Sequence, residues 1–258
     1  MTELTHPAYG ELRQVTPTAA VLLQNNPNMM TLDGTNTWIL RAGGGSVVVD
    51  PGQLGDDHID RLAALGPVDL VLLTHGHFDH SQAAAEFAQR VQAPVRAQDD
   101  QWCVDAEPLT DGERIPVGDL DIEVLLTPGH TSDSLCLRID GAVLTGDTIL
   151  GRGTTIVAHP DGRLAPYLDS LHRLAALPEG VIGLPGHGPE LPDVAGTARQ
   201  YLEHRQARLE QVRTALDKIG PTATAREVVE LVYADVPEIL WPAAELSVHA
   251  QLDYLQGR

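Results

Sequence analysis

The feature that most constrains this chain is the motif His75-x-His77-x-Asp79-His80, which comes directly after an apolar stretch. The stretch Val68–Thr74 is almost continuously apolar, which predicts a strand covered on both faces. Three imidazoles and one carboxylate within six residues are nitrogen and oxygen ligands of the kind that zinc prefers. Extended backbone would point His75 and His77 to one side, and a following turn would bring Asp79 and His80 to a second site. The motif therefore predicts a fold in which a buried strand ends at a pair of metal ions.

Three further stretches place a ligand-type residue beside glycine where an expected strand ends. They are Pro128-Gly129-His130-Thr131, Thr145-Gly146-Asp147-Thr148 and Pro185-Gly186-His187-Gly188. Glycine lets the backbone turn sharply and approach an ion closely. Each stretch alone is weak evidence, because a histidine in a Gly-Pro turn is usually a surface residue. Together with the first motif, they put five His and two Asp at the same end of the expected strands.

The remaining pattern predicts an α/β domain followed by a helical module. Short apolar runs predict two hairpins, Asn36–Arg41 with Ser46–Asp50 and Leu135–Ile139 with Ala142–Thr145, and single strands over Leu120–Thr127 and Val181–Leu184. Two helices are expected between them, Ser81–Gln92 because it is rich in alanine and Leu164–Leu177 because its apolar residues have helical spacing. Sheets packed between helices account for this mixture. Three further helices follow: Ala195–Ile219, a helix opened by a capping box from Thr224 to Glu227, and Ala243–Leu255. We therefore divide the chain into residues 1–193, a catalytic domain, and residues 194–258, a C-terminal helical module.

Charge and composition narrow the class of protein. Lys and Arg number 17 against 36 Asp and Glu, and −17 of the net charge of −19 belongs to residues 1–193. This acidity argues against a general polyanion binder. There is no apolar run of about 18 residues and no basic-then-apolar leader, so we expect neither a membrane span nor secretion. Cys103 and Cys136 are too few for a disulfide scaffold; we expect inert thiols and a cytoplasmic location.

In order and spacing, the ligand-type residues resemble the metallo-β-lactamase superfamily. The resemblance covers residues from about 16 to 193 and implies an αββα sandwich with a dinuclear metal site at one edge. It implies one zinc ion on His75, His77 and His130, a second on Asp79, His80 and His187, and Asp147 bridging both. The expected cofactors are thus two Zn²⁺, with iron or manganese as alternatives.

Asp147 and the C-terminal sequence narrow this resemblance further. Superfamily members that hydrolyse β-lactams have Cys at this position or lack a bridging carboxylate, whereas glyoxalase II-like thioesterases and ribonuclease Z-like phosphodiesterases have Asp. Residues 146–155 and the segment Tyr201-x-x-His204-Arg205-x-x-Arg208 look like the lactamase-beta-2-like branch, which carries a C-terminal winged-helix module. The chain departs from that branch in one respect, because it stops at Arg258 and leaves no room for a full β-wing.

These observations predict a zinc-dependent hydrolase in which a metal-bridging hydroxide attacks a carbonyl or phosphoryl centre. Asp79 and Asp147 are the expected catalytic residues, and no side-chain nucleophile is required. The leading hypothesis is a small ester or thioester substrate, as in glyoxalase II. We expect an anionic substrate, because bound metal would make the site locally positive on an acidic body. A basic cluster for a glutathione carboxylate is not evident, so the thiol carrier stays open.

A second hypothesis is a single-stranded RNA endoribonuclease, which the lactamase-beta-2-like branch implies. It needs a basic track, for which the candidates are Arg199, Arg205, Arg208, Arg213 and Arg226. The acidic charge does not favour it. A β-lactamase and a metal-sensing interaction protein rank lower. Arg205 falls among the apolar positions of its helix, and we expect its head group to pair with a carboxylate at the domain junction. The sequence indicates no oligomeric state.

Overall fold

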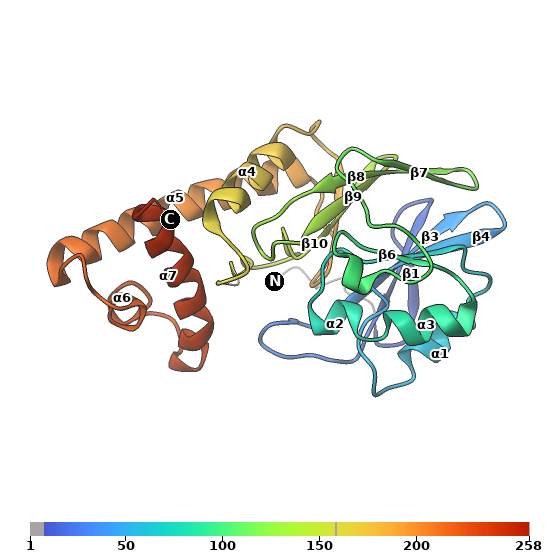
Figure 1. Cartoon of the computed structure of the whole chain (residues 1–258), viewed down its shortest axis with the longest axis horizontal. Helices are drawn as coiled ribbons and strands as arrows, with labels where there is room; N and C mark the ends of the chain where they lie inside the picture. The colour runs from blue at the N-terminus through green and yellow to red at the C-terminus, as the bar shows by residue number, and fades with distance from the viewer. Residues whose placement is uncertain (1–7, 158, 258) are drawn as a thin grey trace.

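Apolar residues on both faces of the strands dictate a layered fold, because a strand buried on two sides needs a cover on each. In β3 (Asn36–Ala42), Trp38 and Leu40 pack toward the other sheet, whereas Ile39 packs toward helices. The computed structural model describes residues 8–157 and 159–257. It has two sheets face to face, with helices on the outer face of each (Figure 1). The predicted αββα sandwich is confirmed.

The first sheet has six strands that lie side by side in chain order. They are β1 (Leu12–Gln14), β2 (Ala19–Leu23), β3, β4 (Gly45–Val49), β5 (Leu70–Leu72) and β6 (Val95–Arg96). Pairing is antiparallel from β1 to β4 and parallel from β4 to β6. Helices α1 (His58–Ala63) and α3 (Ala84–Val91) cover its outer face, and the short helix α2 (Phe78–Ser81) follows β5.

The second sheet has five strands in the order β11-β10-β9-β8-β7. They are β7 (Arg114–Val117), β8 (Leu120–Leu126), β9 (Leu135–Ile139), β10 (Ala142–Gly146) and β11 (Ile182–Pro185). All neighbours are antiparallel except β10 and β11. Helix α4 (Leu164–Ala175) and the first part of α5 (Val194–Ile219) cover its outer face. Burial there raises the pKa of the Cys136 thiol to about 11, which makes it inert at neutral pH as expected.

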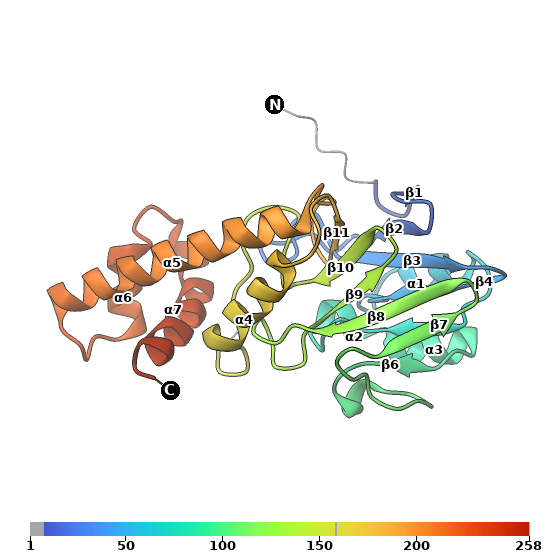
Figure 2. The same cartoon turned by 90° about the horizontal axis from the view of Figure 1, so that it is seen from above.

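The C-terminal helices form a small core of their own beside the sandwich (Figure 2). Helix α5 continues past the second sheet to pack against α6 (Ala225–Val232) and α7 (Trp241–Leu255). The predicted capping box is confirmed, since Thr224 Oγ1 accepts from the Glu227 amide and the Glu227 carboxylate accepts from the Thr224 amide. Between residues 194 and 257 the structure describes helices and no strand. Because α5 packs in both parts, a division between residues 193 and 194 stays a prediction.

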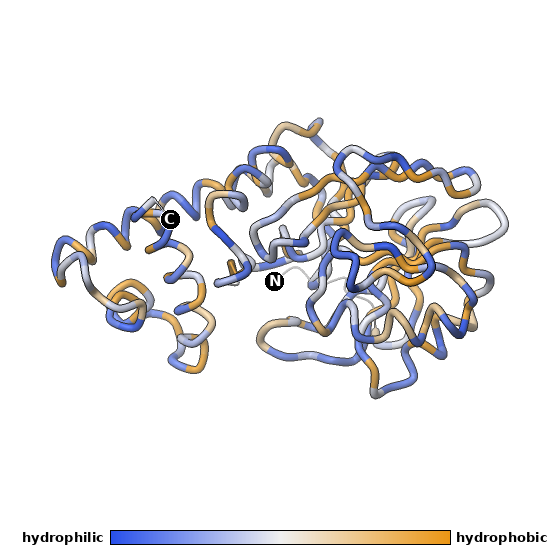
Figure 3. Tube along the Cα trace, in the orientation of Figure 1, coloured by the Kyte–Doolittle hydropathy of each residue, from blue (hydrophilic) through white to orange (hydrophobic). Residues whose placement is uncertain are grey.

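Hydropathy follows these layers. The strands of both sheets are the most apolar part of the chain, and polar residues alternate along the outer helices (Figure 3). Two short 3₁₀ helices, η1 (Asp100–Trp102) and η2 (Glu238–Leu240), complete the structure. Within the described ranges, no helix combines the length and apolar character that crossing a bilayer requires.

Candidate metal centre

The seven predicted ligands meet at one edge of the sandwich, where strands of both sheets end. The turn after β5 and helix α2 supply four of them, and the loops after β8, β10 and β11 supply one each: His75, His77, Asp79, His80, His130, Asp147 and His187. Their ligand atoms form three overlapping groups, each within 4.8 Å. The groups are His75–His77–His130, Asp79–His80–His187 and His75–His80–Asp147. The structure thus brings together all seven predicted ligands.

Distances between the ligand atoms fit shared ions. His130 Nε2 lies 3.0 Å from His77 Nδ1, and His80 Nε2 lies 3.3 Å from His187 Nε2. Asp79 Oδ2 lies 3.3 Å from the His80 nitrogen and 3.2 Å from the His187 nitrogen. Ligands at about 2.0–2.1 Å from a tetrahedral zinc ion stand roughly 3.4 Å from one another. The observed spacings therefore match the edges of such a tetrahedron.

Two buried atoms point to the same conclusion. His75 Nε2 and Asp147 Oδ1 have no hydrogen-bond partner among the described residues. A buried polar atom without a partner costs free energy, and each such atom in a native structure calls for an explanation. Both atoms belong to the ligand groups, so a bound metal ion would satisfy them. The residues present fit a pair of metal ions.

Asp147 lies between the His75–His77–His130 group and the Asp79–His80–His187 group. Its Oδ2 is 3.8 Å from His130 Nε2 and 3.3 Å from His187 Nε2, and its Oδ1 is 3.6 Å from His80 Nε2. A bridging ligand needs this intermediate position. Gly186 makes room for it, because a Cβ on that residue would stand 2.5 Å from Asp147 Oδ1.

Hydrogen bonds on the far side of the rings decide which nitrogen faces the centre. The Nδ1 atoms of His130 and His187 lie 2.6 and 3.0 Å from the backbone carbonyls of Ile156 and Gly34. A carbonyl only accepts, so each Nδ1 carries the proton and donates it. Nε2 of the neutral His130 then presents a lone pair to the centre, which is the form a metal ligand needs, and Nε2 of His187 does so once its own proton has left.

Asp50 is a functional residue that the sequence analysis does not identify. It is 1% exposed, and its carboxylate accepts from the Thr74 amide at 2.8 Å, the Thr74 hydroxyl at 2.6 Å and His80 Nδ1 at 2.9 Å. It therefore orients His80 in the way that Ile156 orients His130. The available signal was its place at the end of an expected strand, before Pro51-Gly52, which is where the other ligand stretches also begin.

The two halves of the centre, His75–His77–His130 and Asp79–His80–His187, differ in the protonation of their histidines. Burial lowers the pKa of His75 and His77 and brings that of His130 to about 4, so these rings are neutral at pH 7. Burial acts in the same direction on His80 and His187, but the carboxylates of Asp79 and Asp147 outweigh it. They raise the pKa of His187 to about 9 and hold that of His80 well above its ordinary value.

A cleft opens beside His130 and Asp147 and is mainly apolar. It is lined by Met29, Met30, Leu32, Leu150, Arg152, Gly153, Thr154, Thr155 and Ile156 in addition to these two ligands. The guanidinium of Arg152 donates to both carboxylate oxygens of Asp33. The cation in this lining is therefore already paired.

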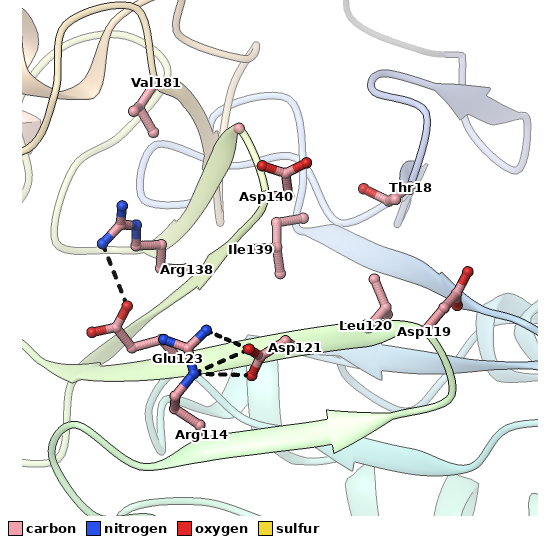
Figure 4. A pocket seen from close by; sticks show the side chains of 11 residues that line it. Thr18, Arg114, Asp119, Leu120, Asp121, Glu123, Arg138, Ile139, Asp140 and Val181 are labelled. Atoms are coloured by element: carbon pink, nitrogen blue, oxygen red, sulfur yellow. Dashed lines mark hydrogen bonds and ion pairs between the residues drawn. The ribbon is translucent and has the colours of Figure 1, made fainter.

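A second pocket, of about 460 Å³, lies over strands β7 to β9 and contains none of the predicted ligands (Figure 4). Its two arginines are paired within the pocket, Arg114 with Asp121 and Arg138 with Glu123. Asp119 and Asp140 add further negative charge. We assign the chemistry to the metal centre.

The sequence analysis expected a carboxylate as the partner of Arg205, and this prediction is wrong. The guanidinium is buried at the junction as expected, but within the described ranges it makes no ion pair with a carboxylate. Instead it donates to the backbone carbonyl of Thr155 and lies 5.1 Å from the centre of the Tyr167 ring. A carbonyl and an aromatic face take the place of the carboxylate, because those are the groups that pack opposite this face of α5.

Comparisons with known proteins found matches along most of the chain. The family model described as "Metallo-beta-lactamase superfamily" matches residues 30–187, and that described as "Beta-lactamase associated winged helix domain" matches residues 224–258. The "Beta-lactamase-like protein 2 homolog" of Drosophila melanogaster is 30% identical, over 94% of this chain and 89% of its own. The "Atrochrysone carboxyl ACP thioesterase" of Aspergillus fumigatus is 30% identical, over 90% of this chain and 78% of its own. A crystal structure of a metallo-beta-lactamase family protein from Thermus thermophilus superposes with a TM-score of 0.79 at 25% identity and 94% coverage of both chains. The winged-helix type predicted for the C-terminal module is confirmed.

Proposed function

The chain belongs to the metallo-beta-lactamase superfamily, and from that premise we propose that it is a two-metal hydrolase of small thioesters or esters. One observation carries the proposal: the groups His75–His77–His130 and Asp79–His80–His187 are linked by a third, His75–His80–Asp147, all at metal-binding spacing. Among the described residues, two buried atoms of these groups, His75 Nε2 and Asp147 Oδ1, have no hydrogen-bond partner. Nitrogen and carboxylate ligands of this kind suit zinc, with iron or manganese as alternatives.

The seven ligands would hold the two ions in the arrangement that the family resemblance implies. His75, His77 and His130 would hold one ion, and Asp79, His80 and His187 the other, with Asp147 between them. Divalent ions bound there would supply a Lewis acid for the scissile carbonyl and would lower the pKa of bound water to about 7. Asp50, Gly34 and Ile156 hold the ligand rings in place.

Asp79 is the carboxylate that is placed to orient an attacking water molecule. Its side chain is 20% exposed, against 10% for Asp147, and its Oδ2 accepts from the Thr35 hydroxyl at 3.0 Å. Burial works to raise the pKa of Asp79, but His80 and His187 outweigh it and hold that pKa well below its ordinary range. Asp79 is therefore ionised at neutral pH and can accept a hydrogen bond from an attacking water, which orients that water.

The cleft and one relative favour an acyl substrate. The methionine and leucine side chains beside His130 suit an apolar acyl group, and the relative from Aspergillus fumigatus is named a thioesterase. The charge of bound metal would favour an anionic substrate. A cytoplasmic location, which the absence of a disulfide pattern indicates, belongs to the same proposal.

The RNA hypothesis has less support, because the arginines it needs are engaged. Carboxylates pair with Arg199, Arg213 and Arg226. Backbone carbonyls and tyrosine rings hold Arg205 and Arg208. An electrostatic track for RNA needs cations that face the solvent and the phosphates.

Hydrolysis assays with three substrates test the proposal. Zinc-loaded protein is incubated separately with S-lactoylglutathione, an acyl N-acetylcysteamine thioester and a single-stranded RNA. We expect thioester hydrolysis that is lost in His77→Ala and kept in His172→Ala, which makes the same change at an exposed histidine on α4. RNA cleavage with a steep salt dependence, together with intact thioesters, would reverse the ranking of the two hypotheses.

A further inference from the structure

Helix α5 reaches from the C-terminal module to the loop that lines the cleft. On one face of α5, Tyr201 and Arg205 stand one turn apart and are both buried. The Tyr201 hydroxyl accepts from the Leu150 amide at 3.1 Å and donates to the Gly153 carbonyl at 2.9 Å. Arg205 Nη2 donates to the Thr155 carbonyl. Two side chains of α5 therefore hold three points along residues 150–155.

The same stretch of backbone holds a predicted metal ligand. The Ile156 carbonyl accepts from His130 Nδ1 at 2.6 Å, and Thr155 Oγ1 lies 3.2 Å from the same nitrogen. Arg205 thus holds one side of the Thr155–Ile156 segment while His130 contacts the other. A shift of this segment would move the acceptor that sets which His130 nitrogen carries the proton.

Arg205 is not explained by packing alone. It is 3% exposed, its Nε has no hydrogen-bond partner among the described residues, and it faces a carbonyl and a ring in place of a carboxylate. A buried cation in such surroundings is costly, and an apolar side chain of similar length would fill the space as well or better. What the guanidinium adds is a directed, charge-assisted hydrogen bond to the Thr155 carbonyl.

We propose that Arg205, assisted by Tyr201, is a positioning residue that holds residues 150–156 so that the Ile156 carbonyl fixes the orientation and tautomer of His130. The proposal rests on the metal centre of the proposed function and not on the identity of the substrate. It makes the first helix of the C-terminal module part of the support for the centre.

Arg205→Met and Arg208→Met form the matched pair that tests this proposal. Arg208 lies three residues further along α5, donates to the Val232 carbonyl at 2.9 Å and lies 4.3 Å from the centre of the Tyr233 ring. It therefore makes the same kinds of contact as Arg205, but toward the helical module. Both variants are compared with wild type for Zn²⁺ affinity, by competition with a chromophoric chelator, and for the ¹⁵N shifts of the His130 ring in the metal-free protein.

We expect Arg205→Met to weaken binding of one of the two zinc ions by about 10- to 100-fold, which is typical when the support of a ligand is removed. The His130 ring shifts should move toward a mixture of tautomers, while the thermal midpoint stays equal or rises. Arg208→Met should change neither zinc affinity nor the His130 shifts. Tyr201→Phe, which removes only the hydroxyl, should act in the same direction as Arg205→Met with a smaller effect.

Wild-type zinc affinity and wild-type His130 shifts in Arg205→Met would overturn the proposal. If that variant does not fold, the same result in Tyr201→Phe would overturn it. An equal loss of affinity in Arg208→Met would also do so, because it would indicate a general effect of arginine loss from α5. Zinc binding is measured without substrate, so a wild type that binds zinc but hydrolyses no thioester would overturn the proposed function and leave this one standing.

Discussion

The two halves of the metal centre have similar ligand spacing, but their imidazoles are neutral in one half and protonated in the other. The three-histidine group, His75–His77–His130, is neutral because burial alone dominates its imidazoles. In the aspartate group, Asp79–His80–His187, the carboxylates of Asp79 and Asp147 keep both imidazoles protonated in the metal-free protein. Burial acts on the imidazoles of both halves, so the neighbouring carboxylates decide which imidazoles must lose a proton before they can bind a metal ion at pH 7.

Asp147→Asn should have the largest effect, because it removes the charge that both halves share. We expect turnover to fall on the order of 1000-fold or more, as for other groups that act as a unit. The isosteric amide keeps the volume of the side chain, so the fold should survive. Metal analysis and thioester hydrolysis measure the outcome, and full turnover with two ions bound would show that the halves do not depend on a shared carboxylate.

Metal affinity should depend on pH in one half only. An ion entering the aspartate group must displace protons, so its affinity should rise about tenfold per pH unit and per proton released, up to about pH 9. An ion in the three-histidine group should bind almost independently of pH above pH 6, because those rings are already neutral. Chelator competition between pH 6 and 9 measures both affinities. Parallel pH dependence of the two affinities would remove the distinction between the halves.

His58 offers the same burial effect outside the centre. Burial lowers its pKa to about 4, against about 6.5 in the unfolded chain, and its Nε2 lies 2.8 Å from the Thr37 hydroxyl. Between those values the unfolded state binds more protons, so stability is lost as pH falls from 6.5 toward 4. Between pH 7.5 and pH 5 we expect the free energy of unfolding, measured with urea, to fall by about 2 kcal/mol more in wild type than in His58→Gln. Equal losses in the two proteins would contradict the burial argument.

Gly186→Ala tests how closely the two halves of the centre are packed at their junction. The added Cβ would stand 2.5 Å from Asp147 Oδ1 and 2.7 Å from His80 Cε1, which forces the junction of the two halves apart. We expect a loss of about 1–3 kcal/mol in the free energy of unfolding, together with weaker zinc binding. Gly44→Ala is the control, because nothing lies within 4 Å of its Cβ position. Unchanged zinc affinity in Gly186→Ala would mean that the junction is looser than its geometry indicates.

The ligand set was predictable because its chemistry is local in the sequence. Each ligand follows an apolar run that identifies a strand end, and these ends, from both sheets, meet at one edge of the sandwich. The short elements β1, β6 and α1 lack such a pattern and were not predicted. The helix expected over Ser81–Gln92 begins at Ala84 instead, because the separate turn α2 uses the backbone up to Ser81 to present Asp79 and His80.

The residues that hold the ligands in place were harder to predict, because their contacts join distant parts of the chain. The position of Arg205 on the buried face of α5 was readable, whereas the Thr155 carbonyl opposite it, 50 residues away, was not. Asp50 reaches His80 across 30 residues in the same way. Periodicity shows which face of an element is buried but not which group packs against it.

We propose that Asp147 joins two ligand groups into one dinuclear centre. Elemental analysis of the wild-type protein, saturated with zinc and dialysed, gives the number of ions that this centre holds. We expect two metal ions per chain. A fully folded protein that retains one ion or none would contradict it.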